Sequence, residues 1–121
     1  MKILVVDDDP ATLIVAVTAL EQIGGYEVFQ AKGGAEAVEC AKQKRPDAIL
    51  MDLVMPDLNG PDVLELLRAH PHTKRIPVIF HTARTEPSDI RGMLALGAKG
   101  VIGKPFDPLR LPGEVARILN S

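Results

Sequence analysis

Aromatic side chains are scarce in this sequence of 121 residues: they make up 3% of it, and none is a tryptophan. Proteins that hold single-stranded nucleic acid stack its bases on aromatic rings, so that class is disfavoured. The charges give no support for nucleic-acid binding either, because the formal net charge is −2 and the basic residues are scattered. Hydrophobic residues still make up 46%, which excludes disorder and predicts a globular domain with an aliphatic core.

Cysteine and long apolar runs are also lacking. The one cysteine cannot form an internal disulfide, which suits a reducing compartment. No apolar run approaches the roughly 18 residues of a membrane span, and the opening MKILVVDDD turns acidic too early for a signal peptide. We therefore expect a cytoplasmic protein of one domain, residues 1–121, without an output domain and without direct contact with membrane or nucleic acid.

Short apolar runs alternate along the chain with longer amphipathic stretches. Four runs lack polar alternation, which is typical of strands buried on both faces of a parallel sheet: residues 3–6, 48–51, 77–80 and 100–102. Residues 26–29 alternate in polarity and predict an edge strand with one face in water.

A helical pattern follows each of the five strands. The patterns cover about residues 10–23, 34–43, 61–70, 88–96 and 107–120. Asp9 and Pro10 are typical of a helix start, as are Asp107 and Pro108, whereas Pro112 predicts that the last helix restarts or kinks at this position. Strands and helices in this order predict an α/β fold with a doubly wound parallel sheet and right-handed crossovers.

Polar residues follow the predicted strands where each strand ends. Asp7, Asp8 and Asp9 follow the first strand, Asp52 ends the third, Thr82 ends the fourth and Lys104 follows the fifth. In such sheets functional residues gather beyond the carboxyl ends of the strands, so these groups should converge. Crowded carboxylates repel one another unless a cation lies between them, and oxygen ligands of this kind favour Mg²⁺.

The same groups suit phosphoryl transfer. A lysine and a threonine hydroxyl can hold the oxygens of a phosphoryl group, and one carboxylate then acts as the nucleophile and becomes an acyl phosphate. Asp52 is the better candidate, because it stands alone on a central strand and is not needed as a helix cap. Asp9 is interpreted as the cap of the first helix.

Four motifs in this order resemble the receiver domain of two-component response regulators: VVDD, MDLVMPDLNG, HTA and GKPF. The resemblance runs from Lys2 to about Leu119. It implies a doubly wound (βα)5 flavodoxin-like sandwich with a five-stranded parallel sheet. A receiver of this family is a signalling phosphoacceptor rather than an enzyme, although it catalyses its own phosphorylation and dephosphorylation.

The resemblance also implies roles for the residues at the strand ends. Asp52 corresponds to the phosphoacceptor. Asp7 and Asp8, with Asp52 and the backbone carbonyl of Val54, correspond to the ligands of Mg²⁺, for which Mn²⁺ is an alternative.

Two further residues and the partners follow from the same resemblance. Thr82 corresponds to the hydroxyl that follows the phosphoryl group, and Lys104 to the lysine that binds it. The implied donor is a sensor histidine kinase or a histidine phosphotransfer protein. The implied output is altered binding of a downstream protein or output domain, including a phosphorylation-dependent dimer.

The sequence departs from the family pattern at a position through which the family signals its phosphorylated state. The family pairs the threonine with an aromatic residue, and here Val101 occupies the position three residues before Lys104. Val54 and Arg84, two residues after Asp52 and Thr82, are the positions that tune how fast the family's acyl phosphate is lost.

The first helix has no charged side chain from Ala11 until Glu21. We assign its inward positions to Val15, Ala16, Ala19, Leu20 and Ile23. The outward positions would then be Leu13, Ile14 and Val17, an exposed apolar patch of the kind that marks a contact surface. In the resembled family this helix contacts the phosphodonor, so we interpret these three residues as the centre of its docking site.

Other interpretations stay open at this point. A pseudo-receiver would keep the fold and act by phosphate-independent binding, but the site residues are all present. An aspartyl-phosphate phosphatase usually has a second aspartate where Val54 stands, and a flavin carrier would need aromatic rings and a hydroxyl-rich loop after the first strand. Asp57 is interpreted as a surface residue, and His81 as a packed strand residue on the face opposite Thr82.

Overall fold

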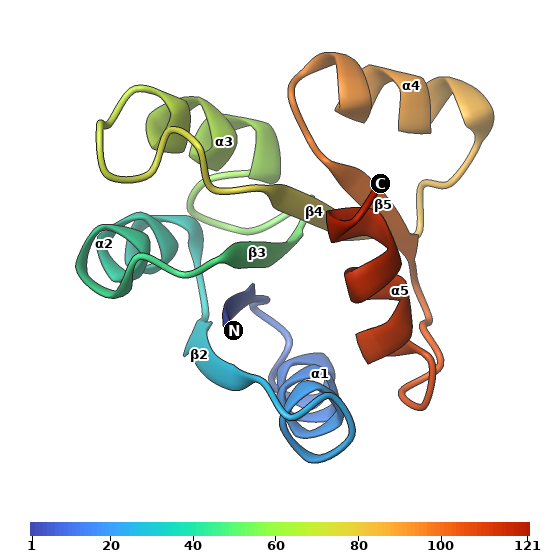
Figure 1. The fold of residues 1–121 in the computed structure, drawn as a ribbon. Coiled ribbons are helices and arrows are strands. Elements are labelled where there is room, and N and C mark those ends of the chain that lie inside the picture. The colour runs from blue at the N-terminus through green and yellow to red at the C-terminus, as the bar shows by residue number, and fades with distance from the viewer.

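In the computed structural model, which describes residues 1–121, five strands alternate with five helices (Figure 1). The strands are β1 (Lys2–Val6), β2 (Glu27–Ala31), β3 (Ala48–Asp52), β4 (Val78–Thr82) and β5 (Gly100–Gly103). The helices are α1 (Pro10–Gln22), α2 (Gly34–Lys44), α3 (Gly60–Arg68), α4 (Pro87–Ala95) and α5 (Leu111–Leu119). The predicted alternation is confirmed.

All strands belong to one parallel sheet in the order β2-β1-β3-β4-β5. β2 lies at an edge, as its alternating polarity predicts. β3 and β4 are buried along their whole length, which explains their uninterrupted apolar sequence. The doubly wound fold class is confirmed.

Helices cover both faces of the sheet (Figure 1). α1 and α5 pack on one face in a core cluster that includes Leu20 and Leu111, and α2, α3 and α4 pack on the other in a cluster that includes Leu64 and Phe80. Phe80 is the one fully buried aromatic ring, so the core is aliphatic as expected. No helix has both the length and the apolar character that crossing a membrane requires.

The N-terminus of α1 follows its sequence signals. The Asp9 carboxylate accepts hydrogen bonds from the backbone N–H and the hydroxyl of Thr12, at 3.4 and 2.6 Å, and Pro10 occupies the first turn. This cap holds the helix directly after the acidic end of β1.

The start of the last helix differs from the prediction. Asp107 forms a turn, in which its carboxylate accepts from the Leu109 N–H at 3.0 Å, and α5 begins only at Leu111. Pro112 therefore lies in the first turn of α5, where no backbone N–H is needed. Of the two outcomes predicted for this proline, a helix start is confirmed and a kink is not.

Candidate functional site

The candidate site lies at the carboxyl edge of the sheet, where β1, β3, β4 and β5 end side by side. The parallel register sets Asp52 opposite His81 and Thr82 opposite Gly103, directly before Lys104. Asp7 continues β1, and its backbone N–H donates to the Ala31 carbonyl at 3.1 Å. The sequence prediction that these strand ends converge is confirmed.

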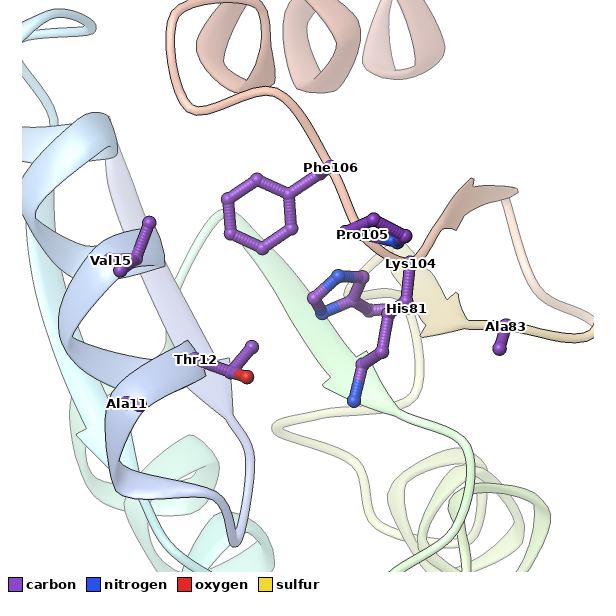
Figure 2. A pocket seen from close by; sticks show the side chains of 8 residues that line it. All are labelled: Ala11, Thr12, Val15, His81, Ala83, Lys104, Pro105 and Phe106. Atoms are coloured by element: carbon purple, nitrogen blue, oxygen red, sulfur yellow. The ribbon is translucent and has the colours of Figure 1, made fainter.

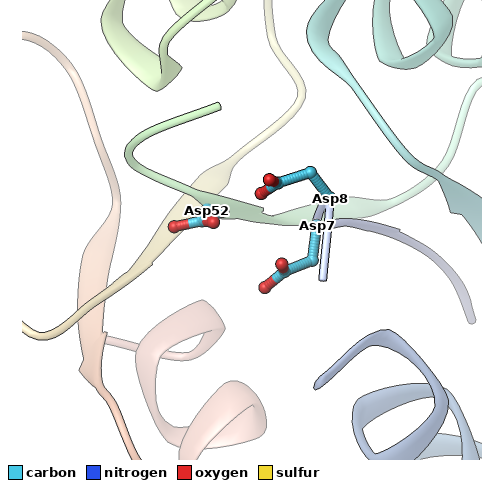
Figure 3. Close-up of side chains that lie close together, drawn as sticks. All are labelled: Asp7, Asp8 and Asp52. Atoms are coloured by element: carbon cyan, nitrogen blue, oxygen red, sulfur yellow. The ribbon is translucent and has the colours of Figure 1, made fainter. Parts of the chain in front are cut away.

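Three carboxylates form an acidic cluster at this edge (Figure 3). Asp7, Asp8 and Asp52 each place an oxygen so that the three lie within 4.8 Å of one another. Asp7 and Asp52 are buried, with exposed fractions of 1% and 8%, whereas Asp8 is exposed. Asp7 Oδ1 accepts a hydrogen bond from the Asp9 N–H at 2.9 Å, which fixes the turn into α1.

Lys104 bridges the two buried carboxylates. Its Nζ lies 3.2 Å from Asp7 Oδ2 and 3.2 Å from Asp52 Oδ1. Burial lowers the pKa of Lys104, but the carboxylates of Asp7 and Asp52 outweigh it, and the net shift is upward. Burial and the adjacent Asp7 raise the pKa of Asp52, which the Lys104 ammonium opposes. The ammonium therefore stabilises a pair of carboxylates that would otherwise repel each other.

The donor set fits a hard divalent cation. It consists of carboxylate oxygens only, and Asp7 Oδ2 is buried without a directed hydrogen bond, although it lies close to Lys104. Mg²⁺ takes oxygen ligands of this kind and keeps several waters, which the exposed side of the cluster at Asp8 allows.

Thr82 is buried at the end of β4. Its Oγ1 accepts a hydrogen bond from the Arg84 N–H at 3.0 Å, so the hydroxyl shapes the turn after the strand. Nothing in the sequence indicated this bond. A hydroxyl can keep such a bond and still donate its own proton to another oxygen.

Gly60 lets the segment after Asp52 pack closely. A Cβ atom at this position would lie 2.6 Å from Cε1 of Phe80 and 3.1 Å from the Asp52 carbonyl oxygen. The Gly60 N–H also donates to the Leu53 carbonyl at 2.7 Å. The start of α3 is thereby fastened against the strand end that carries Asp52.

Asp57 has a role that the sequence analysis missed. Its carboxylate accepts hydrogen bonds from the backbone N–H groups of Gly34 and Ala35, both at 3.0 Å, and so caps α2 from a distant loop. These bonds lower the pKa of Asp57 to about 2. Asp57 is exposed, as its interpretation as a surface residue predicts, and the cap is an additional role that only the fold creates, by bringing the two segments together.

The predicted outward face of α1 needs correction. Leu13 and Val17 are buried, with exposed fractions of 2% and 8%, and only Ile14 is exposed, at 64%. The buried positions 13, 16, 17 and 20 follow the spacing of one helix face, which turns Val15 and Ile23 outward instead. The exposed large apolar residues of α1 and its C-cap are therefore Ile14, Val15 and, at the cap, Ile23.

A cavity of about 450 Å³ opens between α1 and the connection from β5 to α5 (Figure 2). Its walls are mostly apolar, and Lys104 and His81 lie at its inner end. The residues on its two sides include Ala11, Thr12 and Val15 of α1 and Lys104, Pro105 and Phe106 across from them. Val15 therefore lines the same cavity as Lys104, the residue that contacts Asp7 and Asp52.

The chain matches known proteins along its whole length. The family model of the response regulator receiver domain matches residues 3–116. Protein PilH of Pseudomonas aeruginosa is 38% identical over 118 residues, which cover 98% of this chain and 97% of PilH. The DNA-binding response regulator MtrA of Mycolicibacterium smegmatis is 37% identical over 94% of this chain, which spans only 48% of MtrA.

Solved structures agree with these relatives. The chemotaxis response regulator CheY4 of Vibrio cholerae is 33% identical, with a TM-score of 0.89 over 97% of each chain. The receiver domain of the sensor histidine kinase PA1611 of Pseudomonas aeruginosa, solved with a magnesium ion in its active-site cleft, is 33% identical with a TM-score of 0.86 over 99% of this chain and 98% of that one. With its flavodoxin-like (βα)5 fold, the chain belongs to the response regulator receiver domains and is a receiver of two-component signalling.

Proposed function

We propose that Asp52 accepts a phosphoryl group from a phosphohistidine of a sensor histidine kinase or a histidine phosphotransfer protein, in the cytoplasm and with Mg²⁺ bound beside it. The observation that carries this proposal is the bridge formed by Lys104, whose Nζ is 3.2 Å from both Asp7 and Asp52 inside the acidic cluster. Phosphoryl transfer needs a carboxylate that acts as nucleophile, an ammonium that binds phosphoryl oxygens and a cluster of carboxylates that can hold a cation.

In the transfer step an oxygen of Asp52 forms a bond to phosphorus, and the bond from phosphorus to the partner's imidazole nitrogen breaks. The electron pair of the broken bond stays on that nitrogen. The product is an acyl phosphate on Asp52 and a free histidine on the partner. When bound, Mg²⁺ neutralises charge on the phosphoryl oxygens and takes them up as ligands.

The ligands that we propose for Mg²⁺, or for Mn²⁺ in its place, are the carboxylates of Asp7, Asp8 and Asp52 and the backbone carbonyl of Val54. Lys104 would exchange its contact with Asp52 for the phosphoryl oxygens. Asp7 and Lys104 then remain paired, which keeps the ammonium in place during the step.

Thr82 is the residue through which we propose that the phosphorylated state is read. Its hydroxyl donates to a phosphoryl oxygen and thereby pulls on the exposed residues 83–86, which lead into α4. Because Val101 has no ring to turn inward, the signal passes through this segment to a downstream protein, an output domain or a second copy of the chain.

The surface that we propose for the phosphodonor is the exposed apolar face of α1, which consists of Ile14, Val15 and Ile23. It replaces the set that the sequence predicted, because Leu13 and Val17 belong to the core. Val15 also lines the cavity that leads to Lys104, so a helix docked on this face would bring its histidine near Asp52.

The acceptor is tested by mass spectrometry after incubation with acetyl phosphate and Mg²⁺. One added phosphoryl group is expected, and none in Asp52→Asn. A phosphoryl group that persists in Asp52→Asn contradicts the assignment of Asp52. An unmodified wild-type protein would instead favour the pseudo-receiver, which binds partners without phosphate.

The docking face is tested by replacing Ile14 and Val15 together with lysine. Transfer from the cognate histidine protein should slow by a large factor, while phosphorylation by acetyl phosphate stays unchanged because Asp52 is untouched. Leu66→Lys is the matched control, since Leu66 is an exposed leucine on α3, with 47% of its surface exposed. Equal losses with both donors would show that the face supports the fold rather than docking.

A further inference from the structure

His81 is buried beside the site without a role in the proposed transfer. It precedes Thr82 on β4, is 2% exposed, and packs its ring on Phe106 with 4.8 Å between the ring centroids (Figure 2). Its Nδ1 lies 3.9 Å from Oδ2 of Asp7. His81 therefore joins the connection after β5 to the carboxylate at the end of β1.

Nε2 of His81 is a buried polar atom that has no hydrogen-bond partner. Oδ2 of Asp7 is also buried, and its polar neighbours are the Lys104 ammonium at 3.2 Å and His81 Nδ1 at 3.9 Å. A buried polar atom without a partner lowers the stability of a fold, and an apolar side chain would avoid that cost at a position surrounded by core. Such exceptions are expected where function requires the polar group.

The imidazole faces Asp7 through Nδ1, and its other nitrogen, Nε2, is buried without a partner. A neutral ring carries one N–H, and the nitrogen that faces a carboxylate is the one that holds it. Nδ1 faces Asp7, which leaves Nε2 as the nitrogen without a proton.

We propose that His81 is a positioning residue for the metal ligand Asp7, to which it donates a hydrogen bond from Nδ1 once the carboxylate turns toward a bound cation. This role rests on the proposed function. The distance of 3.9 Å is longer than a hydrogen bond, and rotation of the carboxylate closes it. A residue that hydrogen-bonds a metal-binding side chain orients that side chain, and its loss typically lowers metal affinity by about 10–100-fold.

The first test compares the wild type with His81→Leu and His81→Gln, with Mg²⁺ affinity measured by titration calorimetry and thermal unfolding measured without metal. His81→Leu should raise the midpoint of unfolding, because the unpaired nitrogen is gone, and should weaken Mg²⁺ binding about tenfold or more. His81→Gln should recover part of the affinity. Ile102→Leu is the control, since Ile102 is the register neighbour of His81 on β5 and carries no polar atom.

Unchanged Mg²⁺ affinity in His81→Leu overturns the proposal, and so does equal weakening in the Ile102→Leu control. A wild-type protein that binds no Mg²⁺ would overturn the proposed function itself, and this role with it.

A second test needs no variant and stands even if His81→Leu does not fold. Nitrogen-15 NMR of the histidine ring distinguishes the two neutral tautomers. The proton should lie on Nδ1, and a proton on Nε2 overturns the proposal.

Discussion

α3 and α4 are helices of equal length on the same face of the sheet, yet they are held very differently. α3 begins at a cap in which the Asn59 side chain accepts from the Asp62 N–H at 3.1 Å, and it buries Gly60, Val63, Leu64 and Leu67. α4 has no side-chain cap, contains Gly92 in its middle and buries only Met93. Its N-terminal connection, residues 83–86, is exposed throughout.

The difference matches the two roles proposed for the site. The helix that follows the Asp52 strand is fixed, so the proposed acceptor keeps its place. The helix that follows the Thr82 strand has few buried contacts, so its local unfolding or displacement costs little free energy. We therefore expect a change at Thr82 to move α4 and to leave α3 where it is.

The largest effect on stability is expected from Gly60→Ala, at the start of α3. The added methyl group would meet the Phe80 ring at 2.6 Å and the Asp52 carbonyl at 3.1 Å. Overpacking of this kind should lower the free energy of unfolding by about 2 kcal/mol, measured by urea denaturation. Gly113→Ala is the control, because nothing lies within 4 Å of its added methyl group; equal losses in both variants would contradict the close packing at Gly60.

Replacing the residue at the N-cap position of each helix, Asn59 for α3 and Glu86 for α4, sharpens the comparison. Asn59→Ala should cost about 1 kcal/mol, because the Asp62 N–H loses its acceptor. Glu86→Ala should change stability by less than about 0.5 kcal/mol, the usual range for an exposed side chain without a special contact. Thermal unfolding of both variants measures the difference, and equal losses would mean that α4 has a cap of its own in solution.

Gly92→Ala should reduce the difference in local stability between α3 and α4. Nothing lies within 4 Å of the methyl group, so the alanine should stabilise α4 by about 0.5–1 kcal/mol. Hydrogen exchange should show greater protection of α4 amides and unchanged protection of α3. If α4 must move to signal, the phosphorylated variant should also bind its downstream partner more weakly.

A pH-dependent effect is expected from Asp57→Asn, which keeps one of the two acceptor oxygens at the N-terminus of α2. The folded-state pKa of Asp57 is about 2, below its ordinary value of 3.8. A lowered pKa means that the carboxylate stabilises the fold above about pH 4 and that this stabilisation is lost as the pH falls toward 2. Urea denaturation between pH 2 and pH 5 should show a shallower pH dependence in Asp57→Asn than in the wild type.

The sequence predicts the strands and the residues at their ends well, because a buried parallel strand has a continuous apolar run that ends abruptly. Asp7, Asp52 and Thr82 could be placed at one edge for this reason. The rotation of α1 about its own axis could not be predicted. A helix with no charged residue from position 11 to 20 offers no polar face to compare with an apolar one.

Other misses have different causes. The last helix has two candidate starts, at Pro108 and Pro112, and local signals do not choose between them. The contact of Asp57 with Gly34 and the approach of His81 to Asp7 join residues far apart in the chain, and only the packed sheet creates them. Both are contacts of polar side chains whose partners no periodic pattern reveals.

The bridge formed by Lys104 also has a consequence for the charge of the cation that the proposed site would hold. Three carboxylates and one ammonium leave the cluster with two negative charges, and one divalent ion neutralises them. A monovalent ion leaves the carboxylates partly uncompensated, and a trivalent ion brings a surplus positive charge into a half-buried place. In the proposed site the lysine would thus contribute to the choice of ion by fixing the valence that the site requires, and oxygen chemistry would then select among the divalent ions.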